Sequence, residues 1–164
     1  MQSMPPFQHS IEFLRTEMGV ILTSTVERLF LAAILGGIIG LERQFRHKAA
    51  GLRTNMLICF GAAMFTILSH ELASRFSGDH MRIAAQIIPG IGFIGAGAIL
   101  RERGSVIGLT TAATIFVTAS IGMAAGGGLY ITATFATLVV LCALVVLGKL
   151  EDYFERRNSK PVSE

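Results

Sequence analysis

Long runs of uncharged, mostly hydrophobic residues follow one another along this chain, and short clusters of charged residues separate them. No Asp, Glu, Lys or Arg occurs in residues 104–148, and shorter uncharged runs cover 83–100, 54–70 and 29–41. A run of about 18 apolar residues is typical of one membrane-spanning helix, so the longest run predicts two. Glycines 126–128 mark a turn between them. The pattern therefore predicts spans at about residues 25–42, 53–70, 83–100, 105–125 and 129–148.

Composition agrees with a lipid environment. Hydrophobic residues make up 52% of the 164 residues and charged residues 15%, whereas soluble domains carry about 25% charged residues. We therefore predict an all-α, polytopic helical membrane protein with five transmembrane helices in a lipid bilayer.

The sequence S-T-V-E at 24–27 has the form of a capping box, which predicts that the first helix of the membrane domain (residues 25–148) begins there. Residues 1–24 are expected to form an N-terminal extracytoplasmic segment. Within it, residues 8–23 either lie flat at the membrane surface as an interfacial helix or fray. Residues 149–164 are expected to form a cytoplasmic tail.

The basic residues predict the orientation. Ten of the 14 Lys and Arg residues fall on one predicted side of the five spans. Because Lys and Arg in short loops favour the cytoplasmic side, we expect the N-terminus outside and the C-terminus in the cytoplasm.

Residues Gly90, Gly92 and Gly95 reproduce the glycine spacing of a dinucleotide-binding turn. That motif needs an acidic residue about 20 positions later for the ribose, and the uncharged run excludes one at that distance. Basic residues are divided among the loops rather than gathered on one face, so nucleic-acid binding is not expected either.

Catalytic and metal-binding patterns are not apparent. His70, Glu71, Asp79 and His80 match no defined metal-ligand spacing. The predicted spans contain no nucleophile–base pair and no paired carboxylates. We therefore expect no cofactor, no metal and no enzymatic activity.

Glycines are expected to let helical backbones approach, because small residues drive helix association in lipid. Pro89 should kink or break the third helix. That helix is either a bent, tightly packed central helix or an interrupted helix whose free carbonyls face a substrate or ion path. The predicted helix-packing residues are Gly36, Gly40, Gly51, Pro89, Gly90, Gly92, Gly95, Gly97, Gly122 and Gly126.

Polar residues inside the spans need partners. Thr111, Thr114 and Thr118 share one helical face, so their hydroxyls bond another helix, line a crevice, or bond their own helix. Gln86 is expected to bond another helix or lie at the interface. Glu42 and Arg43 should pair with each other or across helices; the alternative is a basic loop that only sets topology.

Three stretches carry a family resemblance: GGIIGLERQFRHKAAGLRTNMLICFGAAMF (36–65), RIAAQIIPGIGFIGAGAIL (82–100) and GLTTAATIFVTASIGMAAGGG (108–128). Together they resemble the MgtC/SapB family of membrane proteins, over about residues 26–148. The resemblance implies a five-span bacterial inner-membrane protein linked to magnesium homeostasis, stress and intracellular adaptation. The matching motifs indicate a functional polar cluster of Glu42, Arg43, Arg53, Thr54, Gln86, Thr110, Thr111 and Thr114.

Two departures from the family pattern stand out. Some members carry a soluble cytoplasmic domain after the last span, whereas 16 residues follow Gly148 here, which suggests a short form without that domain. Many members of the family carry tryptophan where this chain has Phe45 and Phe116, and the replacement removes an indole N–H donor at each position.

Two functions follow as hypotheses. The first is a non-enzymatic regulator that binds other membrane proteins, such as the ATP synthase named by the resemblance, or that associates with itself as a homo-oligomer. The alternative is a small oligomeric transporter or channel that passes an ion or solute through a broken third helix.

Overall fold

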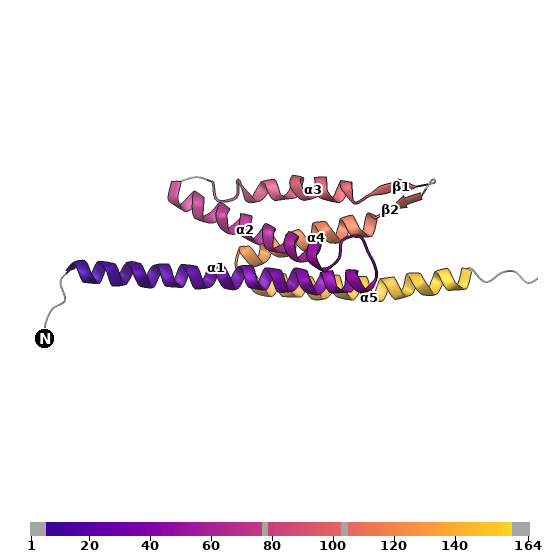
Figure 1. Cartoon of the computed structure of the whole chain (residues 1–164), viewed down its shortest axis with the longest axis horizontal. Coiled ribbons are helices and arrows are strands. Elements are labelled where there is room, and N and C mark those ends of the chain that lie inside the picture. The colour runs from indigo at the N-terminus through magenta and orange to yellow at the C-terminus, as the bar shows by residue number, and fades with distance from the viewer. Residues whose placement is uncertain (1–5, 77–78, 103–104, 159–164) are drawn as a thin grey trace, which may run out of the picture.

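The chain folds mainly as α-helices. The computed structural model describes residues 6–76, 79–102 and 105–158. Its helices are α1 (Pro6–Phe45), α2 (Leu52–Phe76), α3 (Ile87–Gly97), α4 (Leu109–Gly126) and α5 (Tyr130–Asn158), with a 3₁₀ turn η1 (Ala84–Gln86) before α3 (Figure 1). Two short strands, β1 (Leu100–Glu102) and β2 (Ser105–Ile107), form an antiparallel hairpin between α3 and α4 in which Leu100 pairs with Ile107.

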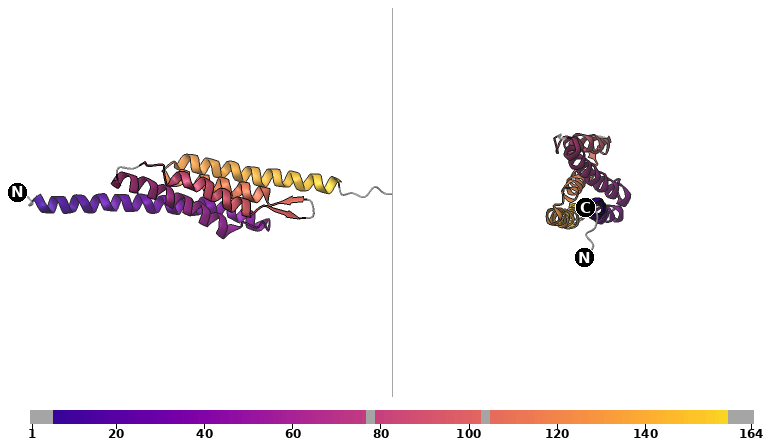
Figure 2. Two further views of the ribbon diagram at one scale, coloured as in Figure 1. Left: turned by 90° about the horizontal axis from the view of Figure 1, so that it is seen from above. Right: turned by 90° about the vertical axis from the view of Figure 1, so that its left-hand side faces the viewer.

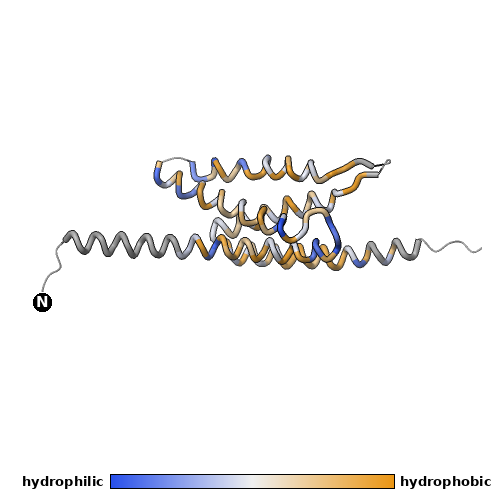
Figure 3. The backbone as a smooth tube through the Cα atoms, viewed as in Figure 1, coloured by the Kyte–Doolittle hydropathy of each residue, from blue (hydrophilic) through white to orange (hydrophobic). Residues whose placement is uncertain are grey.

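The predicted class, an all-α membrane protein with five helices, is confirmed. Among the described residues, four helical segments are long and apolar enough to cross a membrane: Thr23–Phe45, Leu52–Phe76, Leu109–Gly126 and Tyr130–Leu150. The remaining apolar helix, Ala84–Gly97, is shorter. Apolar residues predominate along the helices, and a polar stretch marks the connection between α1 and α2 (Figure 3). The direction of insertion stays a prediction.

Helices α1, α2 and α4 form the centre of the bundle. Helix α2 packs against both α1 and α4, while α5 runs beside α1 and α4. Helix α3 packs on α4 and lies at the edge of the bundle (Figures 1 and 2). The interior is built mostly from small side chains, among them Ala32, Cys59, Ala63, Ala125 and Ala133. Small residues at these contacts keep the backbones close together.

Glycines supply the closest approaches. A Cβ added to Gly36 of α1 would lie 2.6 Å from the carbonyl oxygen of Asn55, and one added to Gly40 would lie 2.7 Å from the Cα of Leu52. On α4, a Cβ at Gly126 would lie 2.8 Å from the Cα of Ala63. Such distances leave no room for a side chain, so these glycines let α1 and α4 touch α2 directly.

The glycines of α3 differ. A Cβ added to Gly90, Gly92 or Gly97 would meet nothing within 4 Å, and one added to Gly95 would make an ordinary 3.7 Å contact with Ala112. The expectation of a central, tightly packed third helix therefore does not hold within this chain. The cause is position: α3 packs against α2 and α4 through Ile87 and Ile91, whereas Gly90, Gly92 and Gly97 have no neighbour where a Cβ would lie.

The expected break at Pro89 is also corrected. Pro89 is the third residue of α3, a position whose N–H has no partner within the helix in any case. The chain instead leaves the helix after Gly97 and returns at Leu109. Gly108 has φ +96°, and a Cβ there would collide with the carbonyl oxygen of Ala98. Glycine is the residue suited to that left-handed turn.

The first and last helices extend beyond the predicted spans. Helix α1 begins at Pro6, so residues 24–27 lie inside a helix and the predicted capping box does not start one. Residues 8–23 are helical and continuous with the first span. Helix α5 continues through the predicted tail as far as Asn158. Residues 1–5 and 159–164 of the predicted terminal segments lie outside the described residues.

Candidate functional site: a buried polar end and an apolar groove

A charged cluster lies at the C-terminal end of α1. The Glu42 carboxylate is 2.9 Å from Arg46 Nε and 3.7 Å from Arg43 Nη1. Arg43 is 2% exposed, although it carries a full charge. Within the described part of the chain, its Nε and Nη2 atoms have no hydrogen-bond partner. A buried guanidinium with unpaired N–H groups is costly, which makes this cluster a candidate functional site.

Asn55 joins three parts of the bundle. Its side-chain amide donates to the carbonyl oxygens of Ala50 at 2.8 Å and Gly51 at 3.0 Å. Its side-chain oxygen accepts a hydrogen bond from the Thr118 hydroxyl at 3.2 Å. Asn55 and Thr118 are both fully buried. This residue therefore ties the α1–α2 connection and the start of α2 to the middle of α4.

The threonine face of α4 points into the bundle. Thr111, Thr114 and Thr118 are all buried. The Thr114 hydroxyl donates to the carbonyl oxygen of Thr110 at 2.7 Å, and Thr118 bonds Asn55. The sequence leaves open whether these hydroxyls bond their own helix or another one, and both kinds of bond occur. Two of the three threonine hydroxyls on this face, those of Thr114 and Thr118, are therefore engaged in hydrogen bonds inside the protein.

The predicted polar cluster is only partly brought together. Glu42 and Arg43 meet, and Thr111 and Thr114 lie inside the bundle. Four other predicted members have exposed side chains at the surface: Arg53, Thr54, Gln86 and Thr110.

The predicted packing glycine of the first loop, Gly51, lies against helix α1, where it meets the Gln44 side chain. A Cβ added to Gly51 would collide with the Gln44 side chain. Phe45 and Phe116, where the family resemblance leads us to expect tryptophan, are 79% and 48% exposed. Neither position therefore requires a buried hydrogen-bond donor.

The sequence analysis did not single out Asn55, the buried polar residue next to two members of the predicted polar cluster. Asn55 follows Arg53 and Thr54 directly, yet it alone faces the interior. The signal was available in the spacing, because Asn55, Cys59 and Ala62 recur at helical intervals along the face that α2 buries. Arg28 was missed as well: its Nη1 atom donates to the carbonyl oxygen of Gly126 at 3.2 Å, at the C-terminal end of α4.

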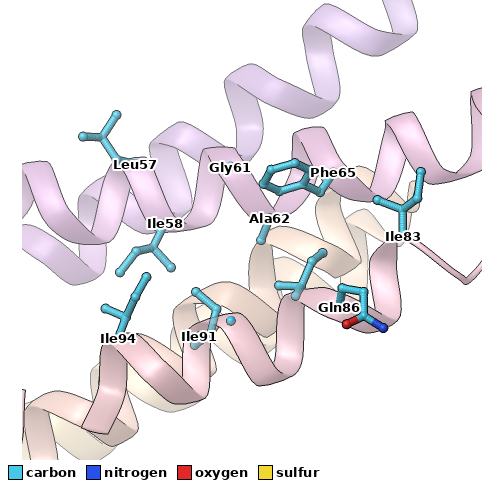
Figure 4. A pocket seen from close by; sticks show the side chains of 11 residues that line it. Leu57, Ile58, Gly61, Ala62, Phe65, Ile83, Gln86, Ile91 and Ile94 are labelled. Atoms are coloured by element: carbon cyan, nitrogen blue, oxygen red, sulfur yellow. The ribbon is translucent and has the colours of Figure 1, made fainter. Parts of the chain in front are cut away.

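A groove of about 450 Å³ opens between α2 and α3 (Figure 4). Its walls are apolar, and Gln86 supplies the one side-chain amide at its rim. Gly61 of α2 and Gly90 of α3 both line it, and a Cβ added to either glycine would meet nothing within 4 Å. The other lining residues are Leu57, Ile58, Ala62, Phe65, Ile83, Ile87, Ile91 and Ile94.

A pair of histidines lies near the C-terminal end of α2. His70 and His80 lie with ring centroids 5.0 Å apart. The described residues contain no group of three or more His, Cys, Asp or Glu side chains placed to hold a metal ion.

The helices and the buried polar end define a helical membrane protein. A family model described as the MgtC family matches residues 29–153, and the chain belongs to that family.

Curated relatives share much of the sequence. The chain is 50% identical over 137 residues to the putative magnesium transporter YhiD of Escherichia coli strain K12, which covers 80% of this chain and 64% of that protein. It is 44% identical over 147 residues to the protein MgtC of Salmonella choleraesuis, covering 90% of this chain and 61% of the relative. For the protein MgtC of Brucella abortus the identity is 46% over 136 residues, with coverages of 82% and 56%.

The chain thus spans about three fifths of the length of the relatives that it matches. No solved structure matches it.

Proposed function

We propose that this protein is a non-enzymatic regulator in the bacterial inner membrane, which acts by binding a transmembrane helix in the groove between α2 and α3. The bound helix belongs to another membrane protein or to a second copy of the chain. The regulated process is magnesium homeostasis, which the name of the Escherichia coli relative suggests.

The observation that carries the proposal is that two glycines with free space around them, Gly61 and Gly90, line an apolar groove. In lipid, helices associate where small residues allow close backbone contact. Gly36, Gly40 and Gly126 already serve contacts inside the bundle, whereas Gly61 and Gly90 leave room for an incoming backbone. A groove with apolar walls and one amide at its rim suits a helix that is itself apolar with an occasional polar residue.

Transport through the bundle receives less support. Magnesium keeps several of its water ligands when a protein binds it and is usually held through one or two carboxylates. Among the described residues of the bundle interior, the carboxylate of Glu42 is accompanied by Arg43 and Arg46, which would repel a cation. The hydroxyls of Thr114 and Thr118 are engaged within the protein, and α3 is not interrupted at Pro89.

Affinity purification in a mild detergent tests the proposal. The wild-type chain should recover a second membrane protein or a homo-oligomer. Gly90→Leu, which fills the groove, should lose that partner while the protein still elutes as a folded species. Gly92→Leu is the matched control, because Gly92 lies on the same helix, is equally open and does not line the groove. Recovery of a bare monomer from the wild type would contradict the proposal.

A flux measurement separates the transport alternative. Purified protein in liposomes should show no passage of magnesium, protons or anions above empty vesicles. Flux that depends on Thr114 would favour a transporter over a regulator.

A further inference from the structure

We propose that Arg43 is the centre of an anion-binding site at the end of the bundle, which takes a phosphate-type oxyanion. This site is independent of the proposed regulatory function, since the site and the groove are formed by different residues.

Arg43 has unmet hydrogen-bonding capacity. Its side chain is 3% exposed, and its Nε and Nη2 atoms have no partner among the described residues. Almost all buried polar groups in proteins are paired, and an exception calls for a missing ion, water or ligand. Nε and Nη2 lie side by side on a guanidinium and match two oxygens of a phosphate or carboxylate.

The distribution of charge around Arg43 favours an anion as well. Glu42 lies closer to Arg46, at 2.9 Å, than to Arg43, at 3.7 Å. One carboxylate therefore faces two guanidinium groups, and the cluster retains a net positive charge. Lys48 in the adjoining connection adds another exposed cation. The resulting field attracts anions to this end of the molecule.

The register of the helices places Arg43 beyond the start of α2. Gly36 and Gly40 of α1 lie against Asn55 and Leu52 of α2. Arg43, three residues further along α1, is therefore about 4.5 Å past the level of Leu52. Since α2 begins at Leu52, Arg43 reaches the space beyond the end of that helix.

Helix α4 reaches the same level with its N-terminus. Thr118 contacts Asn55, and Thr111 lies seven residues earlier on the same helical face, about 10 Å nearer the end. The helix starts after Gly108, and no side chain caps it there. The first N–H groups of α4 have no partner within the helix and carry its positive dipole end. Such a terminus favours phosphate and other oxyanions.

Two sources provide this chemistry: free phosphate in solution and the phosphate of a lipid headgroup. The end of a membrane-spanning bundle is within reach of both. The ligand would approach past the α1–α2 connection, where His47, Lys48 and Ala49 are exposed.

The experiment uses the whole 164-residue chain in a maltoside detergent, which contains no phosphate. Inorganic phosphate and phosphatidylglycerol are added separately, with chloride at equal ionic strength as the reference, and binding is followed by titration calorimetry and thermal unfolding. Stabilisation by inorganic phosphate identifies the free anion, and stabilisation by the lipid alone identifies the headgroup.

Variants locate the effect. Arg43→Gln should weaken binding by about tenfold or more, as expected for the loss of charge-assisted hydrogen bonds. Arg43→Lys keeps the charge but loses the two-pronged donor, and should give an intermediate affinity. Lys149→Gln removes an exposed cation next to Gly148, which lies against Arg46 at the same end of the bundle, and should leave binding unchanged.

The wild-type titration keeps the proposal testable even if Arg43→Gln fails to fold. No binding of either ligand by the wild type would overturn it. Equal losses in Arg43→Gln and Lys149→Gln would overturn it too, because they would indicate non-specific attraction to surface charge. An experimental structure with water alone on Nε and Nη2, in crystals grown with phosphate, would have the same consequence.

Discussion

Asn55 accepts a hydrogen bond from the hydroxyl of Thr118 across the interface between α2 and α4, over 3.2 Å and out of contact with solvent. The same Asn55 side chain donates to two carbonyl oxygens of the α1–α2 connection. A single amide thus holds the connection and α4 in one arrangement. In hydrocarbon or in a dry interior, such a network specifies helix register because its members have no solvent to bond instead.

Removal of this amide should destabilise the bundle. Asn55→Ala leaves Thr118 and the carbonyl oxygens of Ala50 and Gly51 without that partner, at a cost of about 2 kcal/mol in the free energy of unfolding. Thermal unfolding in detergent measures the effect. The control is Thr54→Ala at the exposed neighbouring position, which should unfold like the wild type; equal stability of the two variants would show that the network contributes nothing.

Glycines inside the bundle and glycines on α3 should respond oppositely to alanine. Gly126→Ala introduces a Cβ 2.8 Å from the Cα of Ala63, and the resulting overpacking should cost about 2 kcal/mol. Gly97→Ala meets nothing within 4 Å and should stabilise α3 slightly, since alanine is the better helix former. Denaturation of the two variants side by side checks this. Similar losses in both would mean that α3 is packed inside a larger assembly.

Arg28 should support the junction between α4 and α5. Its guanidinium bonds the carbonyl oxygen of Gly126 and lies 3.7 Å from the position of a Cβ on Gly128, which has φ +80°. A cation at a helix C-terminus is favourable. Arg28→Ala should therefore lower the free energy of unfolding by about 1 kcal/mol, whereas Glu27→Ala, at an exposed adjacent position, should have little effect on the melting temperature.

The predicted orientation can be read from thiol labelling in intact cells. Lys48→Cys lies in the connection expected to face the cytoplasm, and Met81→Cys lies in the connection expected to face outward; both native residues are exposed. A membrane-impermeant maleimide should label Met81→Cys and spare Lys48→Cys, with the unmodified chain as background. The reverse pattern would invert the topology.

Periodicity and charge predicted the helical class because both are local properties of the chain. The packing role of the glycine pairs Gly36/Gly40 on α1 and Gly122/Gly126 on α4 could also be predicted, because a spacing of four residues places both members of a pair on one helical face. What local pattern does not show is which neighbour that face meets. The glycines of α3 are as closely spaced as those of α1, yet α3 lies at the edge and α1 at the centre.

The remaining differences arise from contacts between distant segments. Arg53, Thr54 and Asn55 are all polar, and the sequence alone does not show which of them is buried. The face that α2 turns toward α1 and α4 contains Asn55, so Asn55 is the buried one. The hairpin after α3 contains Arg101 and Glu102, charges that the sequence pattern places in a loop. Its pairing and the left-handed turn at Gly108 end the third helix earlier than its apolar composition suggested.

Photocross-linking in native membranes tests most directly whether the α2–α3 groove binds a protein helix. A photoreactive amino acid at Phe65, within the groove, is compared with one at Ile131 on the exposed side of α5. We expect a discrete protein adduct from position 65, lost in the Gly90→Leu background, and none from position 131. Lipid adducts alone from both positions would refute helix binding in the groove.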